Sequence, residues 1–192
     1  MKPGQGELFG SEALTLPEGF LYVTDFIDEA EERRLVAGIG ELALEEARYK
    51  DYTAKRRVAS FGGSYDYSAN TLGDAPEIPP FLFPLRDKVA AWLKIAPENL
   101  KHALVAEYRP GTPLGWHRDV PDFERVVGVS LGGWARMRFR PYPPDKSTPL
   151  NLDLAPRSAY LMQGAARWRW QHSIPPTKEL RYSITFRTRR GA

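Results

Sequence analysis

The sequence has 192 residues, of which 42% are hydrophobic and 12% aromatic, so it can bury one sizeable core and gives no sign of a second. It contains no cysteine, no apolar run of about 18 residues and no basic-then-apolar leader, which excludes disulfides, thiolate zinc sites and membrane-spanning helices. We therefore expect a soluble, cytoplasmic monomer without a membrane partner. The formal net charge of +3 and a pI near 9.1 permit a polyanionic partner.

The N-terminal part is predicted to be an arm followed by a strand and a helix. Residues 1–18 contain glycines but no periodicity, and we expect a flexible arm to which we assign no function. A short strand is predicted over 19–26, and Asp28-Glu29-Ala30-Glu31 has the pattern of a capping box that opens a helix. Residues 41–50 fit either a helix or a strand.

A basic segment then leads into a glycine-rich loop that carries aromatic residues. Nucleic-acid bases stack on such aromatics, at about 1–3 kcal/mol per base, and phosphates pair with such cations. The alternative is a solvated hairpin with ordinary core tyrosines, and the residues alone favour neither interpretation. The candidate substrate-contacting residues are Arg57, Phe61, Tyr65 and Tyr67.

A proline-rich loop over 76–84 precedes a predicted helix in which apolar residues, Trp92 among them, recur at helical spacing up to Pro97. We interpret this helix as scaffold, because a tryptophan at such spacing packs in a core far more often than it stacks on a ligand. His102 stands at the head of a strand predicted over 103–108, and we interpret it as structural.

A metal site is predicted from Trp116-His117-Arg118-Asp119 together with a distant histidine. In an extended strand, residues two apart face the same side, so the side chains of His117 and Asp119 converge. Two histidines and one carboxylate hold Fe(II) on one face and leave the opposite positions open for substrate and oxygen. His172 would supply the second histidine. Open positions indicate a catalytic rather than a structural metal.

Residues 126–131 form a nearly continuous apolar run, typical of a buried strand, and a glycine pair turns the chain back into 134–140. In this second strand the three arginines at alternate positions share a face with Trp134. Such a cationic ridge could track a phosphate backbone. It could also be the water-facing side of an edge strand, where charges prevent sheet-to-sheet aggregation, and we favour this second interpretation. The arginines are Arg136, Arg138 and Arg140.

After a polar loop over 141–149, short strands are predicted over 150–154 and 159–163. The alternation over 167–172 predicts a further strand with two tryptophans beside the metal histidine. Trp168, Trp170 and His172 would share its face.

The segment from Arg181 to Arg187 alternates strictly between polar and apolar residues. If its apolar face packs under a covering layer, its arginines point into the barrel. An unpaired charge there costs roughly several kcal/mol unless an anion is bound. A small dicarboxylate between the metal and a guanidinium would satisfy them, because arginine binds carboxylates through two parallel hydrogen bonds.

At this segment the chain resembles a known family. Arg-Tyr-Ser-Ile-Thr-Phe-Arg is similar to the Arg-x-Asn-x-Thr-x-Arg signature of AlkB-like Fe(II)/2-oxoglutarate dioxygenases, and the His-x-Asp pair and the distal histidine precede it in the same order. The resemblance covers roughly residues 55–190. It implies that Arg181 binds the remote carboxylate of 2-oxoglutarate and that Arg187 lies nearer its metal-bound end. Tyr108 and Ser183 are the further co-substrate residues that it implies.

The resemblance also implies the division of the chain and its fold. Residues 19–192 would form one AlkB-like dioxygenase domain, with helical support and a substrate lid over 19–100 and a jelly-roll core over 101–190. Many short strands after two helices independently predict a mainly β protein with flanking helices, a double-stranded β-helix or jelly-roll barrel.

The implied chemistry couples decarboxylation of 2-oxoglutarate, with O2, to hydroxylation of a C–H bond held near Fe(II). On an N-methyl group it releases formaldehyde. We expect single-stranded or alkylated nucleic acid, DNA or RNA, as substrate. Ser183, where DNA-repair members have asparagine, and Pro121, where the bacterial repair enzyme has an acidic residue facing the methylated base, favour the alternative of a protein or small molecule. The remaining alternative is a basic nucleic-acid-binding module without catalysis.

Overall fold

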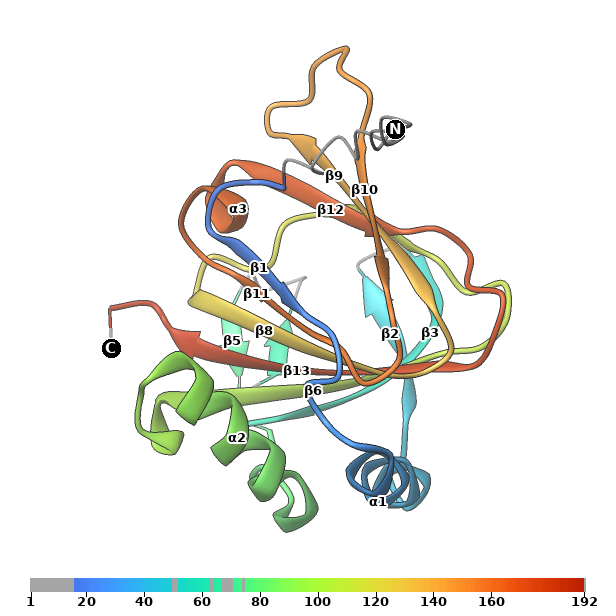
Figure 1. Ribbon diagram of the computed structural model, residues 1–192, viewed down its shortest axis with the longest axis vertical. Coiled ribbons are helices and arrows are strands. Elements are labelled where there is room, and N and C mark those ends of the chain that lie inside the picture. Colours follow the sequence, from blue (N-terminus) through green and yellow to red (C-terminus); the bar gives the residue numbers. More distant parts are fainter. Residues whose placement is uncertain (1–15, 50–51, 63, 67–70, 74, 192) are drawn as a thin grey trace, which may run out of the picture.

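Strands make up most of the structure, a computed structural model that describes residues 16–49, 52–62, 64–66, 71–73 and 75–191 (Figure 1). The strands are β1 Phe20–Val23, β2 Glu45–Tyr49, β3 Tyr52–Phe61, β4 Ser64–Asp66, β5 Thr71–Gly73, β6 Leu100–Tyr108, β7 Leu114–His117, β8 Phe123–Gly132, β9 Ala135–Pro141, β10 Leu150–Leu154, β11 Ala159–Met162, β12 Trp170–Ile174 and β13 Arg181–Arg189. The helices are α1 Glu29–Gly40, α2 Phe83–Leu93 and α3 Gly164–Trp168, with short 3-10 turns at Pro80–Leu82 and Pro97–Asn99.

The strands form two main antiparallel sheets and a small β4–β5 hairpin. The larger sheet has the order β1-β11-β8-β13-β6-β3-β2, and the smaller has the order β10-β9-β12-β7. Figure 1 shows α1 and α2 on the outer side of the larger sheet, away from the smaller one. The two sheets remain separate and do not close into a continuous barrel. The prediction of a mainly β protein with flanking helices is confirmed.

Helix α1 begins at the predicted capping box. The backbone N–H of Glu31 donates to Asp28 Oδ1 at 2.7 Å, and the backbone N–H of Asp28 donates to Glu31 Oε2 at 2.9 Å. These two bonds satisfy donors that the first helical turn leaves without an intrahelical partner. Beyond them, Leu35 and Ile39 pack in the core between the helices and the larger sheet.

We expect Asp28→Ala to lower the free energy of unfolding by about 1 kcal/mol, because it removes the side-chain acceptor of the cap. Urea unfolding measures the change. Asp28→Asn keeps an acceptor oxygen and should stay within a few tenths of a kcal/mol, roughly, of the wild type. Equal stability of the alanine variant and the wild type would contradict the prediction.

Strand β13 lies in the middle of the larger sheet, hydrogen-bonded to β8 on one side and β6 on the other. Ile184 and Phe186 are fully buried in the core beneath the helices. Arg181 and Arg187 alternate with them and therefore face the space between the two sheets. The predicted orientation of this strand, apolar side chains under a covering layer and arginines toward the interior, is what the structure has.

Three local expectations are refined or overturned. Residues 45–49 form strand β2, which settles the choice over 41–50. Trp168 ends helix α3 and does not continue the strand, which begins at Trp170, so the alternation over 167–172 was misread. Strand β9 lies between β10 and β12, so it is not an edge strand.

Residues 1–15 of the expected N-terminal arm lie outside the described residues, and Leu16 packs against the core between the sheets. In the described part of the chain, no helix combines the length and apolarity needed to cross a membrane.

Candidate metal and co-substrate site

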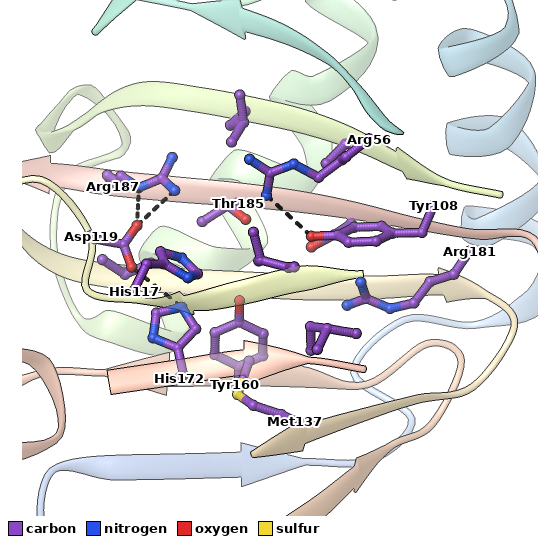
Figure 2. A pocket seen from close by; sticks show the side chains of 16 residues that line it. Arg56, Tyr108, His117, Asp119, Met137, Tyr160, His172, Arg181, Thr185 and Arg187 are labelled. Carbon is purple, nitrogen blue, oxygen red and sulfur yellow. Dashed lines mark hydrogen bonds and ion pairs between the residues drawn. The ribbon is translucent and has the colours of Figure 1, made fainter. Parts of the chain in front are cut away.

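Three residues that could bind a metal meet between the two sheets (Figure 2). His117 ends β7, Asp119 follows two residues later, and His172 lies on β12. Antiparallel pairing of β12 with β7 sets His172 opposite His117, with ring centroids 4.2 Å apart. One ligand atom from each of the three residues lies within 4.8 Å of the others. The predicted trio is therefore brought together, with Asp119 just beyond the strand that carries His117.

Hydrogen bonding and burial keep both imidazoles uncharged, so that each can offer a ring nitrogen to a metal. His117 Nδ1 lies 2.9 Å from the carbonyl oxygen of Gly115, which can only accept, so Nδ1 carries the proton and Nε2 keeps its lone pair. Burial lowers the pKa of His117, and burial together with the neighbouring His117 lowers the pKa of His172 to about 3. Neutral imidazoles are the form that coordinates a metal.

The carboxylate of Asp119 is held as an anion and turned by Arg187. Burial alone would raise the pKa of Asp119, but the charge of Arg187 holds it well below its usual range. Arg187 donates to the same oxygen twice, from Nε at 2.9 Å and from Nη2 at 2.8 Å, so Oδ1 is occupied. Oδ2 faces His172, with His172 Nε2 at 3.7 Å. Asp119 thus offers one oxygen to the candidate metal position.

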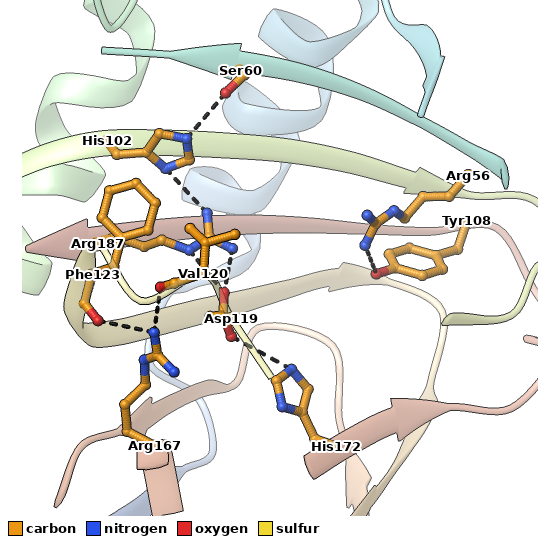
Figure 3. A network of polar contacts seen from close by, with 10 residues as sticks. All are labelled: Arg56, Ser60, His102, Tyr108, Asp119, Val120, Phe123, Arg167, His172 and Arg187. Carbon is orange, nitrogen blue, oxygen red and sulfur yellow. Dashed lines mark hydrogen bonds and ion pairs between the residues drawn. The ribbon is translucent and has the colours of Figure 1, made fainter. Parts of the chain in front are cut away.

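A buried histidine fixes the other side of Arg187 (Figure 3). Arg187 Nη1 lies 3.1 Å from His102 Nδ1, and His102 Nε2 lies 3.0 Å from Ser60 Oγ. Because a guanidinium only donates, Nδ1 of His102 must accept, and its proton must sit on Nε2. His102, which we interpreted as structural, thus connects Ser60 on β3 to Arg187 and, through Arg187, to the carboxylate of Asp119.

We expect His102→Leu to weaken divalent-metal binding by about 10-fold, because outer partners of metal ligands typically contribute that much by orienting them. Titration with Co(II) followed by absorbance measures the change without turnover. His102→Gln supplies an acceptor for Arg187 and a donor for Ser60, and it should restore most of the affinity. Equal metal affinity of the leucine variant and the wild type would show that His102 only fills space.

Arg167 holds the segment that follows Asp119, a role that no sequence signal indicated. It is buried on α3 and donates from Nη2 to the carbonyl oxygens of Val120, at 2.5 Å, and Phe123, at 3.0 Å (Figure 3). These bonds anchor the chain next to the carboxylate by its backbone. Its position on a short helix, misread as a strand, explains why it was missed.

A second part of the same pocket is suited to an anion. Arg181 is 1% exposed, donates from Nε to Ser130 Oγ at 2.9 Å and lies 4.9 Å from the Tyr108 ring centroid. It forms no ion pair with any carboxylate of the described residues. Ser183, Thr185 and Arg187 follow it along the wall of the pocket. A buried guanidinium without a counter-ion favours a bound carboxylate, so these residues fit 2-oxoglutarate.

The hydroxyl of Tyr108 stands between two guanidinium groups (Figure 2). Arg56 donates to it from Nη1 at 3.3 Å, and Arg181 lies on its other side. Although burial opposes ionisation, the charges of Arg56 and Arg181 lower the pKa of Tyr108. Sequence reasoning missed Arg56 and named its neighbour. Extending the period of two back from the apolar Phe61 would have placed Arg56 on the opposite, pocket-facing side.

Of the four candidate lid residues, the two whose side chains the structure describes, Arg57 and Phe61, face away from the pocket. Arg57 faces the other side of the sheet and pairs with Glu107 at 2.8 Å and 2.9 Å. Phe61 is buried in the core under the helices, on the same side. Both are corrected for the same reason, since β3 runs through residue 61 and its alternation turns them away. Tyr67 and the side chain of Tyr65 lie outside the described residues.

A model of the 2OG-Fe(II) oxygenase superfamily matches residues 21–187 of the chain. An uncharacterized protein of Acanthamoeba polyphaga mimivirus is 28% identical over 185 residues, which cover 88% of this chain and 84% of that protein. The Arabidopsis thaliana "Alkylated DNA repair protein ALKBH8 homolog" is 31% identical over 189 residues, covering 86% of this chain and 53% of that protein.

The mouse relative, tRNA (carboxymethyluridine(34)-5-O)-methyltransferase ALKBH8 of Mus musculus, is 28% identical over 187 residues, covering 93% of this chain and 27% of that protein. The chain therefore spans about half of the Arabidopsis relative and about a quarter of the mouse one.

Solved structures share the fold. OsALKBH1 superposes with a TM-score of 0.68 at 16% identity, covering 90% of this chain and 99% of that one. A prolyl hydroxylase from Trichoplax adhaerens, in complex with a peptide of the hypoxia inducible factor oxygen degradation domain, gives a TM-score of 0.63 at 14% identity, covering 89% of this chain and 83% of that one. These similarities confirm the predicted jelly-roll fold.

Proposed function

Because the chain belongs to the 2OG-Fe(II) oxygenase superfamily and is AlkB-like within it, we propose that it oxidises alkyl groups on nucleic acid, DNA or RNA. It is a 2-oxoglutarate-dependent dioxygenase, and its family implies Fe(II) and 2-oxoglutarate. The observation that carries the proposal is the meeting of His117, Asp119 and His172 in one pocket with the buried Arg181, which no carboxylate of the described residues balances.

His117, Asp119 and His172 would hold Fe(II) as three donors on one side, and the positions opposite them would stay open. With 2-oxoglutarate and O2, the bound metal supplies oxidation of a C–H bond, coupled to formation of succinate and CO2. Arg187 keeps Asp119 ionised and leaves one of its oxygens for the metal. Hydroxylation of an N-methyl group gives a product that breaks down to formaldehyde and the demethylated amine.

Arg181 would bind the remote carboxylate of 2-oxoglutarate, with Tyr108 and Ser183 beside it. The two residues of β13 and the tyrosine of β6 are held at fixed spacing, because Arg181 pairs directly with Tyr108 in the sheet. Burial strengthens the attraction between a guanidinium and a carboxylate, since little water competes with it. Arg187, by contrast, has two donors engaged with Asp119.

The names of two relatives support nucleic acid as the substrate, since one is an alkylated DNA repair protein homologue and the other acts on tRNA. One observation favours the second candidate, the same chemistry on a protein or small molecule. Pro121 lies two residues after Asp119 and is exposed, so it offers no carboxylate to a cationic methylated base.

The test is mass spectrometry of single-stranded DNA and RNA oligonucleotides that carry N1-methyladenine or N3-methylcytosine, after incubation with protein, Fe(II), 2-oxoglutarate and ascorbate. We expect loss of one methyl group together with formaldehyde. An unchanged oligonucleotide mass in a sample that makes succinate would overturn the nucleic-acid demethylase proposal and favour the second candidate. The variant His172→Ala provides the inactive control.

A further inference from the structure

The outer face of the smaller sheet carries a group of arginines and aromatics that the metal site does not use. Along β9, Ala135, Met137 and Phe139 are buried in the core between the sheets, so the intervening arginines point outward. No described helix covers this face (Figure 1). We call Trp116, Arg118, Arg138, Arg140 and Tyr142 the β9 surface.

The arginines of β9 differ in how their charge is balanced. Arg136 donates to Asp153 at 2.7 Å and 3.0 Å, so a carboxylate neutralises it. Arg138 donates from Nε to the hydroxyl of Ser173 at 3.0 Å, and Arg140 donates from Nε to the amide oxygen of Gln171 at 2.8 Å. Both acceptors are uncharged. Among the described residues, neither of these two arginines forms an ion pair.

Aromatic rings hold the cations of the β9 surface in place. The guanidinium carbons of Arg138 and Arg140 lie 5.0 Å and 4.5 Å from the ring centroid of Trp116, on β7. Beside them, the guanidinium carbon of Arg118 lies 3.7 Å from the ring centroid of Tyr142. A guanidinium stacked on a ring keeps the N–H groups along its edge available, and these are the groups that bind phosphate. Stacking therefore orders the cations without neutralising them.

Protection of a sheet edge does not explain these cations. Strand β9 is hydrogen-bonded to β10 on one side and to β12 on the other, so it has no free edge to guard. The surface lies on the opposite face of the smaller sheet from the metal site, because neighbouring residues of a strand alternate between its two faces. Arg118 stands between His117 and Asp119 in the chain, while Arg140 pairs with Gln171, the neighbour of His172.

We propose that the β9 surface binds the phosphate backbone of single-stranded nucleic acid, on the outer face of the sheet that carries His117 and His172. Trp134, 57% exposed, and Tyr142, 43% exposed, lie at the two ends of β9 and offer faces on which bases can stack. This pairing of cations with aromatics at both ends favours a nucleic acid over an acidic peptide. The inference rests on the proposed function, because its ligand is the substrate strand.

The experiment measures binding of a fluorescent, unmodified single-stranded 12-mer RNA by anisotropy as the salt concentration rises, with Arg138→Gln/Arg140→Gln compared with the wild type. Each phosphate contact on a single strand contributes about 0.7 to the slope of log K against log salt. Loss of two contacts should reduce that slope by about 1.4 and weaken binding by about 25-fold near 0.1 M salt. Arg136→Gln, on the same strand and face, is the matched control and should bind as the wild type does.

Two further readouts separate a lost contact from damage to the protein. Arg138→Lys/Arg140→Lys keeps both charges and should restore most of the salt slope even if the glutamine variant folds poorly. In turnover of a methylated oligonucleotide, the glutamine variant should show a raised KM for the oligonucleotide and an unchanged KM for 2-oxoglutarate.

Each failure has its own signature. If the affinity and its salt slope are the same in the glutamine variant and the wild type, the β9 surface does not bind the strand. The proposed function is unaffected by that result. Displacement of the RNA by polyglutamate as effectively as by unlabelled RNA overturns nucleic acid as the specific occupant. The demethylation assay described above decides the proposed function separately, because it depends on release of a methyl group and not on affinity.

Discussion

Replacing His172 by alanine is expected to abolish formation of succinate while the fold survives. The change removes one of three candidate metal ligands and leaves only His117 and Asp119 close together. His172 is buried and uncharged, so its removal should lower the free energy of unfolding by about 1–2 kcal/mol, which a domain of this size tolerates. The measurements are succinate by mass spectrometry and Co(II) affinity by absorbance.

Ile174→Val provides the control for His172→Ala, because it also trims a buried side chain of β12 but removes no ligand. It should keep both activity and metal affinity. Near-normal succinate production by the alanine variant, with stoichiometric metal bound, would show that a different residue completes the site.

The second large effect is expected from Arg181→Gln. This change removes a buried charge that no carboxylate of the described residues balances, while the new amide can still reach toward the pocket. A charge-assisted pair contributes about 1.5–3 kcal/mol, so the KM for 2-oxoglutarate should rise by about 10- to 100-fold. Because the lost contact binds the co-substrate far from the reacting carbon, kcat at saturating 2-oxoglutarate should change much less.

Thermal unfolding gives an independent check of Arg181. Saturating 2-oxoglutarate with an inert metal should raise the Tm of the wild type, since a ligand stabilises the state that binds it. The same addition should barely raise the Tm of Arg181→Gln. Arg181→Lys keeps the charge but loses the paired N–H groups of the guanidinium, so its increase in Tm should lie between those of the wild type and the glutamine variant. An unaltered 2-oxoglutarate requirement in the glutamine variant would contradict the anion-binding argument.

The features that the sequence predicted best are those with local periodicity. Strict alternation from Arg181 to Arg187 predicted which side of β13 faces the interior, and the capping box predicted where α1 begins. The three candidate metal ligands were named from their residue types and order, and the structure has them within reach of one another.

What the sequence did not predict depends on contacts between distant segments. Arg167 is 44 residues from Phe123, and His102 is 85 residues from Arg187, so no local pattern links either pair. Arg56 was missed for a different reason, because its segment was interpreted as leading into a loop, whereas it lies on β3, whose alternation turns Arg56 toward the pocket. Errors in element type, a strand in place of α3 and a loop in place of β3, therefore limited the prediction of the pocket.

The central position of β13 makes correct folding and activity inseparable. Its odd-numbered residues from Arg181 to Arg187 face the pocket, while Ile184 and Phe186 fill the core beneath the helices. If this strand slipped by one residue against β6 and β8, the arginines would enter the apolar core and the apolar side chains would line the pocket. Such a slipped chain would lose its stability and its co-substrate together. A misfolded population should therefore be wholly inactive rather than partly active. The measured specific activity would then be proportional to the fraction of molecules in which β13 is correctly paired.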